Sequence, residues 1–309
     1  MQARRVVLHA TGEVRLDALT LPEPGPGEVR LETRLSALSI ASELGVVVGN
    51  VPVTYPTPLG YQSLARVAAL GSAVTALQIG QRVVDTYGHA SHALRPAHRP
   101  IPVPDHIPDA VALCAVLGEE TWRGIRRLDP APGSAVLVAG AGLLGLLSVF
   151  NLTRRGWPAE VIEPDPARRE LALALGARAA WHPDERPGTF AFGLDCSASP
   201  VGFSRLLACL GRGGRVGVLS DGNWGALTLP RAFHERELTL IASNGGDDYP
   251  AYARWLWDHP APQLEQLFQD TLRPDQLPEA YRRYAGPSPR PVSALVMWTE
   301  TEPSAAIPR

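Results

Sequence analysis

Residues 135–156 read AVLVAGAGLLGLLSVFNLTRRG, and this stretch decides the fold of the chain around it. It begins with the strand-like apolar run AVLVAG, turns through glycines, and continues into an apolar segment with helical spacing. Gly140, Gly142 and Gly145 form a G-x-G-x-x-G pattern. Such a turn binds dinucleotides: the first glycine permits the tight turn, the second admits a pyrophosphate, and the third lets helix and sheet pack closely. The stretch therefore predicts a dinucleotide-binding strand, turn and helix.

The surroundings of the glycine turn strengthen a pattern that is weak alone. The helix begins at Leu143 and Leu144, whose backbone N–H groups are able to bind phosphate. Glu163 follows Gly140 by 23 residues, at the end of the next strand, where a carboxylate accepts hydrogen bonds from the adenosine ribose. The alternative is a glycine-rich turn that merely joins two packed elements. The strand, helix and acid together favour the binding site.

The same acid indicates which nicotinamide dinucleotide is bound. A carboxylate at Glu163 would repel a 2′-phosphate, so the sequence favours NAD(H) over NADP(H). Arg168 and Arg169 keep the alternative open, because they begin the next helix and are able to bind a phosphate. Arg168 is equally suited to flank the adenine.

Strands and helices alternate along the rest of this region. We expect strands at 135–140, 159–163, 192–196, 215–220 and 237–243, and helices at 143–156, 167–176, 202–211 and 249–259. Alternation of this kind indicates an α/β fold with a doubly wound parallel sheet, the Rossmann fold. Open parallel sheets bind ligands beyond the carboxyl ends of their strands. Ser197, Leu219 and Ser243 lie at such ends and are candidate cofactor contacts, with plain turn or capping residues as the alternative.

The first hundred residues have a different sequence pattern, without the alternation of strands and helices. Short β-runs broken by Pro and Gly indicate a β-rich, barrel-like domain; they lie at 6–10, 14–19, 29–38, 64–70 and 81–87. PVPDHIPDA (102–110) marks a boundary, and PVSALVMW (291–298) is expected to return as a strand to the first domain. The expected division is therefore 1–108 completed by 262–309, with 109–261 between them. The last eleven residues are expected to form a frayed tail.

Composition excludes several partners. The 309 residues carry a net charge of −2, which lacks the basic excess that neutralises nucleic-acid phosphates. No apolar stretch reaches about 18 residues, and Arg4 and Arg5 lead directly into a strand-like run rather than a signal-peptide core. We therefore expect a cytoplasmic protein that binds a small-molecule substrate, with no nucleic-acid or membrane partner.

Two absences narrow the chemistry. All 29 basic residues are arginines, which excludes lysine Schiff bases and the Tyr-x-x-x-Lys pair of short-chain dehydrogenases. Cys114, Cys196 and Cys209 are widely spaced, and no CxxC or HExxH occurs. Core packing is the expected role of these cysteines.

Several separate motifs resemble one family. They are PEPGPGEV (22–29), GQRV (80–83), PGSAVLVAGAGLLG (132–145) and DPARRELALALGA (165–177). In their order and spacing they resemble the medium-chain dehydrogenase/reductases, the alcohol dehydrogenase superfamily, over nearly the whole chain. The resemblance implies a GroES-like catalytic domain that encloses a Rossmann domain, with the active site between them. It also implies dimerisation through Rossmann edge strands, here 237–243, so we expect a homodimer.

The departures from the family concern zinc. Zinc-dependent members carry a catalytic cysteine where this chain has Ile40, and a histidine ligand where it has Tyr61. The four-cysteine lobe for structural zinc is missing, and the position estimated for a third catalytic ligand is Val116. We expect no zinc at either site.

Hydride transfer without a metal needs other groups to stabilise charge on the substrate oxygen. The resemblance places Ser42 and Tyr61 beside the nicotinamide, where a hydroxyl is able to donate to a carbonyl or relay a proton. Glu43 and Glu119 are weaker candidates for proton exchange, with structural ion pairs as the alternative. Tyr61 has an alternative too, as an aromatic filler of the vacated zinc site.

These observations predict a zinc-independent NAD(P)(H)-dependent oxidoreductase acting on an alcohol, ketone or activated alkene. The two missing zincs are shared with quinone-oxidoreductase-like members and with bacteriochlorophyllide-type hydroxyethyl dehydrogenases. A catalytically inactive nucleotide-binding redox sensor or structural protein is the alternative. A methyltransferase using the same glycine turn is disfavoured by the β-rich first domain.

Overall fold

The computed structural model describes residues 1–185, 187–220, 225–259 and 261–299. Its contacts divide the chain into two compact units. The β-rich unit comprises Met1–Ser39, Val53–Leu113 and Phe268–Arg309, and the Rossmann unit comprises Ile40–Pro52 and Cys114–Leu267. These boundaries lie about five residues beyond the expected ones, and residues 40–52 group with the Rossmann unit rather than with the first domain. The predicted frayed tail falls, from residue 300 onward, outside the described residues.

The Rossmann unit contains a six-stranded sheet in the order β11-β10-β9-β12-β13-β14. Its strands are β9 (Val136–Ala139), β10 (Ala159–Ile162), β11 (Ala179–Trp181), β12 (Phe190–Asp195), β13 (Leu210–Val218) and β14 (Thr239–Ala242). Every neighbouring pair is parallel. Numbered along the chain, the order is 3-2-1-4-5-6, that of the dinucleotide-binding fold. The strand order therefore brings the carboxyl ends of β9 and β12 together at the point where the order reverses.

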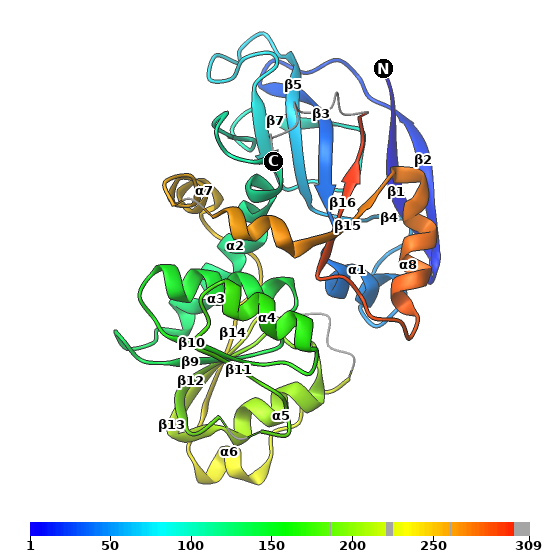
Figure 1. Ribbon diagram of the computed structural model, residues 1–309. Coiled ribbons are helices and arrows are strands. Elements are labelled where there is room, and N and C mark those ends of the chain that lie inside the picture. Colours follow the sequence, from blue (N-terminus) through cyan, green and yellow to red (C-terminus); the bar gives the residue numbers. More distant parts are fainter. Residues whose placement is uncertain (186, 221–224, 260, 300–309) are drawn as a thin grey trace, which may run out of the picture. The chain divides into compact units, whose positions relative to one another are not determined.

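Helices cover both faces of this sheet (Figure 1). The helices of the Rossmann unit as a whole are α1 (Ile40–Val47), α3 (Leu143–Arg154), α4 (Pro166–Ala174), α5 (Pro200–Ala208), α6 (Arg231–Glu235) and α7 (Tyr249–Trp257), and α2 (Asp109–Leu128) has its first residues in the β-rich unit; α3, α4 and α5 pack on the sheet. On one face, α5 buries Phe203 and Leu206 against Leu137 of β9. A short 3₁₀ turn, Pro262–Leu267, completes the unit.

The strand pairs of the β-rich unit are antiparallel, except that β15 and β16 are parallel. Its strands are β1 (Gln2–Ala10), β2 (Glu13–Thr20), β3 (Glu28–Ala37), β4 (Thr57–Pro58), β5 (Gln62–Leu70), β6 (Arg82–Asp85), β7 (His92–Pro96), β8 (Ile101–Pro102), β15 (Phe268–Leu272) and β16 (Ser293–Met297). A second 3₁₀ turn (Pro274–Gln276) and α8 (Leu277–Ala285) lie between β15 and β16. The sheet that includes β3 runs β15-β16-β3-β5-β6-β8. The C-terminal strand β16 pairs with β3, so it returns to the first part of the chain as its sequence predicts.

The predicted elements are confirmed at nearly every position, with ends that differ by a few residues. No range was predicted for the helices α1, α2, α6 and α8, or for the short strands β4, β7, β8, β11 and β15. In the described part of the chain, no helix combines the length and apolarity that crossing a membrane requires.

Candidate dinucleotide-binding site

The three glycines of the turn have distinct surroundings. Gly140 adopts φ +89°, and a Cβ there would lie 2.7 Å from the Ser197 Cα. A Cβ on Gly145 would lie 1.9 Å from the Gly140 carbonyl oxygen. Gly142 differs, because a Cβ there would meet no atom of the chain within 4 Å. The first and third glycines are thus required by packing within the protein, while the second faces open space that a pyrophosphate would need.

The start of α3 offers backbone donors beside that space. Gly142 is the N-cap and has no side chain to accept from the first turn. The first helical bond runs from the Leu146 N–H to the Gly142 carbonyl at 2.9 Å, so the N–H groups of Leu143, Leu144 and Gly145 precede the intrahelical series. The first turn of α3 carries no acidic residue. The positive end of the helix dipole therefore lacks a local counter-charge and suits an anion.

Glu163 braces the glycine turn directly. Its Oε2 accepts a hydrogen bond from the Ala141 N–H at 2.7 Å, and its Oε1 accepts one from the Asp165 N–H at 3.0 Å. The side chain is buried. A carboxylate oxygen accepts more than one hydrogen bond, so both oxygens keep capacity for a ribose hydroxyl. Glu163 thus lies where its spacing predicts, but its contact with the turn was not foreseen.

The arginines after Glu163 begin α4. Asp165 caps this helix by accepting from the Ala167 N–H at 2.8 Å and the Arg168 N–H at 3.3 Å. The Arg169 Nη1 donates to the carbonyls of Glu163 and Pro164, both at 2.7 Å. The Arg169 guanidinium is therefore engaged by the turn between β10 and α4.

A buried carboxylate that the sequence analysis missed lies at the end of β12. Asp195 accepts from the Ser197 hydroxyl at 2.6 Å and from the Ser220 hydroxyl at 3.3 Å, and its carbonyl accepts from the Leu219 N–H at 3.0 Å. Burial raises the pKa of Asp195, and the hydrogen bonds from Ser197 and Ser220 partly oppose this. Ser197 and Leu219 therefore lie at the predicted strand ends, joined by Asp195.

Ser243 lies just after the end of β14. Its N–H donates to the Val218 carbonyl at 3.0 Å, which extends the pairing between β13 and β14. Within the described residues its buried hydroxyl has no hydrogen-bond partner. Buried hydroxyls normally find partners in proteins, so this one is suited to receive a ligand.

Glu119 holds the segment that follows β14. Its Oε1 accepts from the backbone N–H groups of Asp247 at 3.1 Å and Asp248 at 3.0 Å, and from Arg126 at 3.2 Å. Burial raises the pKa of Glu119, opposed by these N–H donors and by the charge of Arg126. Its Oε2 is buried without a partner in the described part of the chain. These contacts give Glu119 a structural role in joining α2 to the start of α7.

The other catalytic candidates lie on separate elements. Ser42 and Glu43 are in the first turn of α1, and Glu43 is buried. Tyr61 immediately precedes β5 and is partly buried. By contacts, α1 belongs to the Rossmann unit and Tyr61 to the β-rich unit.

The cysteines are all buried free thiols. Burial raises the pKa of Cys114, that of Cys196 to about 12, and that of Cys209, which keeps them protonated and poor ligands. Among the residues that the structure describes, no three His, Cys, Asp or Glu side chains are grouped to hold a metal ion.

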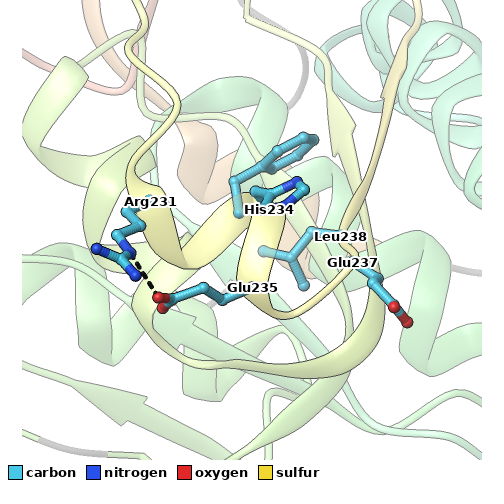
Figure 2. A pocket seen from close by; sticks show the side chains of 6 residues that line it. Arg231, His234, Glu235, Glu237 and Leu238 are labelled. Carbon is cyan, nitrogen blue, oxygen red and sulfur yellow. Dashed lines mark hydrogen bonds and ion pairs between the residues drawn. The ribbon is translucent and has the colours of Figure 1, made fainter.

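A surface pocket surrounds α6 (Figure 2) and is lined by Arg231, Phe233, His234, Glu235, Glu237 and Leu238. Arg231 pairs with Glu235 at 2.6 Å across one helical turn. Because α6 precedes β14, this pocket lies at the amino ends of the strands, opposite the glycine turn. It is therefore separate from the candidate nucleotide site.

Comparisons with known proteins bear on the fold and on the class of protein. No protein-family model matches the chain. The chain is 25% identical over 257 residues to an L-threonine 3-dehydrogenase of Xanthomonas campestris pv. campestris (strain B100), covering 68% of this chain and 75% of the relative.

Two solved structures share the fold. A protein described as a zinc-binding dehydrogenase from Sinorhizobium meliloti 1021, bound to NADP, has a TM-score of 0.83 at 19% identity, covering 96% of this chain and 99% of its own. A protein described as a short chain alcohol dehydrogenase from Escherichia coli CFT073, complexed with NADH, has a TM-score of 0.81 at 17% identity with the same coverage. The predicted fold class, a Rossmann doubly wound parallel sheet plus a β-rich GroES-like domain, is confirmed. The comparisons support membership of the medium-chain dehydrogenase/reductase superfamily.

Proposed function

We propose that this chain is an NAD(P)(H)-dependent oxidoreductase that transfers a hydride to or from an alcohol, ketone or activated alkene without zinc. The observation that carries the proposal is the glycine turn, with open space at Gly142, free donors at the start of α3, and Glu163 beside both. The names of its relatives support the same class, since they are dehydrogenases and two structural neighbours hold NADP or NADH.

The Rossmann unit would hold the nucleotide through its own backbone and one acid. The N–H groups of Leu143, Leu144 and Gly145 would bind the pyrophosphate, and Glu163 would accept from the ribose hydroxyls. Once bound, the nicotinamide supplies or accepts the hydride. Residues at strand ends and at the start of α4 would complete the site: Ser197, Leu219, Ser243 and Arg168.

We propose NAD(H) rather than NADP(H) as the preferred cofactor. A buried carboxylate at the ribose position would repel a 2′-phosphate. Arg168 and Arg169 are the nearby arginines that could offset this repulsion. Arg169 already donates hydrogen bonds to two backbone carbonyls.

The proposed chemistry uses hydroxyl groups in place of a metal. Ile40 and Tyr61 stand where zinc-dependent members of the family carry ligands, and isoleucine cannot donate to a metal. Tyr61 and Ser42 would donate hydrogen bonds to the substrate oxygen. Glu43 is a further candidate for proton exchange; the structural contacts of Glu119 make it the weaker of the two acids.

A homodimer through β14 belongs to the same proposal. This strand is an edge of its sheet, and Leu240 on it is 41% exposed. An exposed edge with an apolar side chain favours pairing with a second strand.

The experiment that tests this function combines metal analysis with a turnover screen. Purified protein, shown to hold no stoichiometric zinc, is mixed with NADH and a panel of ketones, aldehydes and activated alkenes, or with NAD and alcohols. We expect turnover of at least one class, reduced about 100-fold by Tyr61→Phe. Tight NADH binding without any turnover would favour the inactive redox sensor instead.

A further inference from the structure

A buried polar chain crosses the core of the β-rich unit. The Trp298 Nε1 donates to the Ser36 Oγ at 2.9 Å, and the Ser36 Oγ lies 2.8 Å from the His89 Nδ1. Ser36 and His89 are almost completely buried, and Trp298 is buried as well. The three residues come from β3, from the segment before β7, and from the end of β16. Segments far apart in the sequence thus converge on one histidine.

The donors in this chain decide which ring nitrogen of His89 carries a proton. An indole N–H only donates, so the Ser36 oxygen accepts from Trp298. A hydroxyl oxygen is able to accept two hydrogen bonds, but the buried Ser36 hydroxyl hydrogen also needs an acceptor, and among the described residues the His89 Nδ1 is the acceptor within reach. A neutral imidazole with an accepting Nδ1 carries its proton on Nε2. The arrangement therefore favours one neutral tautomer of His89.

The other edge of the ring lies against Gly60. A Cβ on Gly60 would lie 2.5 Å from the His89 Cδ2 and 2.6 Å from its Nε2, and Gly60 adopts φ +80°. The His89 backbone is fixed on both sides, because its N–H donates to the Leu59 carbonyl at 2.7 Å and its carbonyl accepts from the Val6 N–H at 2.8 Å. His89 thus holds the backbone immediately before Tyr61.

We propose that His89 is a positioning residue for Tyr61, with its Nδ1 oriented as an acceptor toward Ser36, which Trp298 fixes in turn. Through Gly60 the ring fixes the backbone that precedes Tyr61, and strand β16 completes the arrangement from the far end of the chain. This inference rests on the proposed role of Tyr61 in hydride transfer. It assigns no proton transfer to His89 itself.

A second polar pair in the same core shows what a purely structural contact looks like. The Thr33 hydroxyl lies 2.7 Å from the Tyr87 hydroxyl, and both groups are buried. Thr33 is on β3 with Ser36, but its contact leads to Tyr87 and not to His89. Thr33→Val is therefore a matched control for Ser36→Ala, since each removes one buried hydroxyl from β3.

The first test needs no substrate. In protein labelled with ¹⁵N-histidine, long-range ¹H–¹⁵N spectra should show the His89 Nδ1 as the unprotonated nitrogen and Nε2 as the protonated one. In protein labelled at the tyrosine Cζ, Ser36→Ala and Trp298→Phe should shift the Tyr61 signal, while Thr33→Val should leave it in place. A protonated Nδ1, or a Tyr61 signal unmoved by both variants, would overturn the inference whether or not an activity has been found.

The second test uses turnover. We expect Ser36→Ala and Trp298→Phe to lower kcat about tenfold with an unchanged Kd for NADH, because nucleotide contacts lie on the Rossmann unit. His89→Asn, which keeps an acceptor near the Nδ1 position, should retain more kcat than His89→Leu. Equal kcat in Ser36→Ala and Thr33→Val would contradict a positioning role. If Tyr61→Phe keeps full activity while the NMR results hold, the role proposed for Tyr61 fails and the tautomer assignment stands.

Discussion

The Glu163 carboxylate accepts a hydrogen bond from the Ala141 N–H at 2.7 Å, which joins the end of β10 to the glycine turn. The acid proposed to select the nucleotide is therefore also part of the loop that would bind its pyrophosphate. Changes at Glu163 should affect both stability and affinity, and a control is needed to separate them.

Replacing Glu163 by Gln should weaken NADH binding about tenfold, which corresponds to about 1.4 kcal/mol. The amide directs an N–H toward the N–H of Ala141 or Asp165, so unfolding should also become easier by about 1–3 kcal/mol. Fluorescence titration and urea denaturation measure the two effects. Glu160→Gln is the control: this buried acid on the same strand accepts from the Trp181 Nε1 at 2.8 Å. The Glu160→Gln variant should lose stability but keep its affinity for NADH. Equal losses of NADH affinity in Glu160→Gln and Glu163→Gln would contradict the role of Glu163.

Alanine substitutions at two glycines of the turn should separate binding from folding. Gly142 has φ −77° and open space at its Cβ, so Gly142→Ala should fold normally and yet bind NADH at least tenfold more weakly. Gly145→Ala places a Cβ 1.9 Å from the Gly140 carbonyl oxygen and should destabilise the protein by about 1–3 kcal/mol. Thermal unfolding and NADH titration test the pair. Unchanged affinity in Gly142→Ala would show that the pyrophosphate lies elsewhere.

Ala198 holds a left-handed backbone conformation, with φ +52°, at the carboxyl end of β12. In this conformation the Ala198 Cβ lies too close to the backbone, and glycine removes that Cβ. Glycine also makes the unfolded chain more flexible, which costs stability, so we expect a net stabilisation of about 0.5–1 kcal/mol in Ala198→Gly. Ala208→Gly, in the exposed last turn of α5, should instead destabilise it by about 0.5–1 kcal/mol. Denaturant unfolding of both variants decides; destabilisation by Ala198→Gly would rule out backbone strain at this position.

Asp195 should make stability depend on pH. Its folded-state pKa is raised by burial above the unfolded value, so the folded protein binds its proton more readily, and this contribution is lost as pH rises through the folded pKa. Asp195→Asn removes the buried charge and should unfold at a higher temperature than wild type at pH 7. The difference should shrink as pH falls toward about 4. Thermal scans across this range test the sign, and a difference that grows on acidification would contradict it.

Much of the Rossmann unit could be predicted from sequence because its apolar runs and helical spacing are long. β11 escaped prediction because it has only three residues, and it forms a strand through its pairing with β10, where Val161 lies opposite Ala180. α8 carries a signal that was overlooked. Its buried residues Leu277, Ala280, Tyr281 and Tyr284 follow helical spacing.

Some features of the candidate site could likewise be predicted from the sequence, and others could not. The 23-residue spacing between Gly140 and Glu163 predicted that the acid follows the strand next to the glycine turn, because a strand, turn and helix together have a nearly fixed length. It did not predict that Glu163 bonds the turn, or that Asp195 gathers Ser197 and Ser220, because such contacts depend on which side chains the folded sheet brings together. The hydrogen-bonded series of Trp298, Ser36 and His89 could not be predicted either, because β3 and β16 come together only in the folded β-rich unit.

The proposed function depends on the glycine turn and Glu163 forming a site for NAD(H). Titration of the metal-analysed protein with NADH and with NADPH, followed by nicotinamide fluorescence, tests it most directly. We expect tighter binding of NADH, with the preference reduced or reversed in Glu163→Gln. Tighter binding of NADPH by the wild-type protein would transfer the phosphate-binding role to Arg168, and binding of neither nucleotide would contradict the proposed function itself.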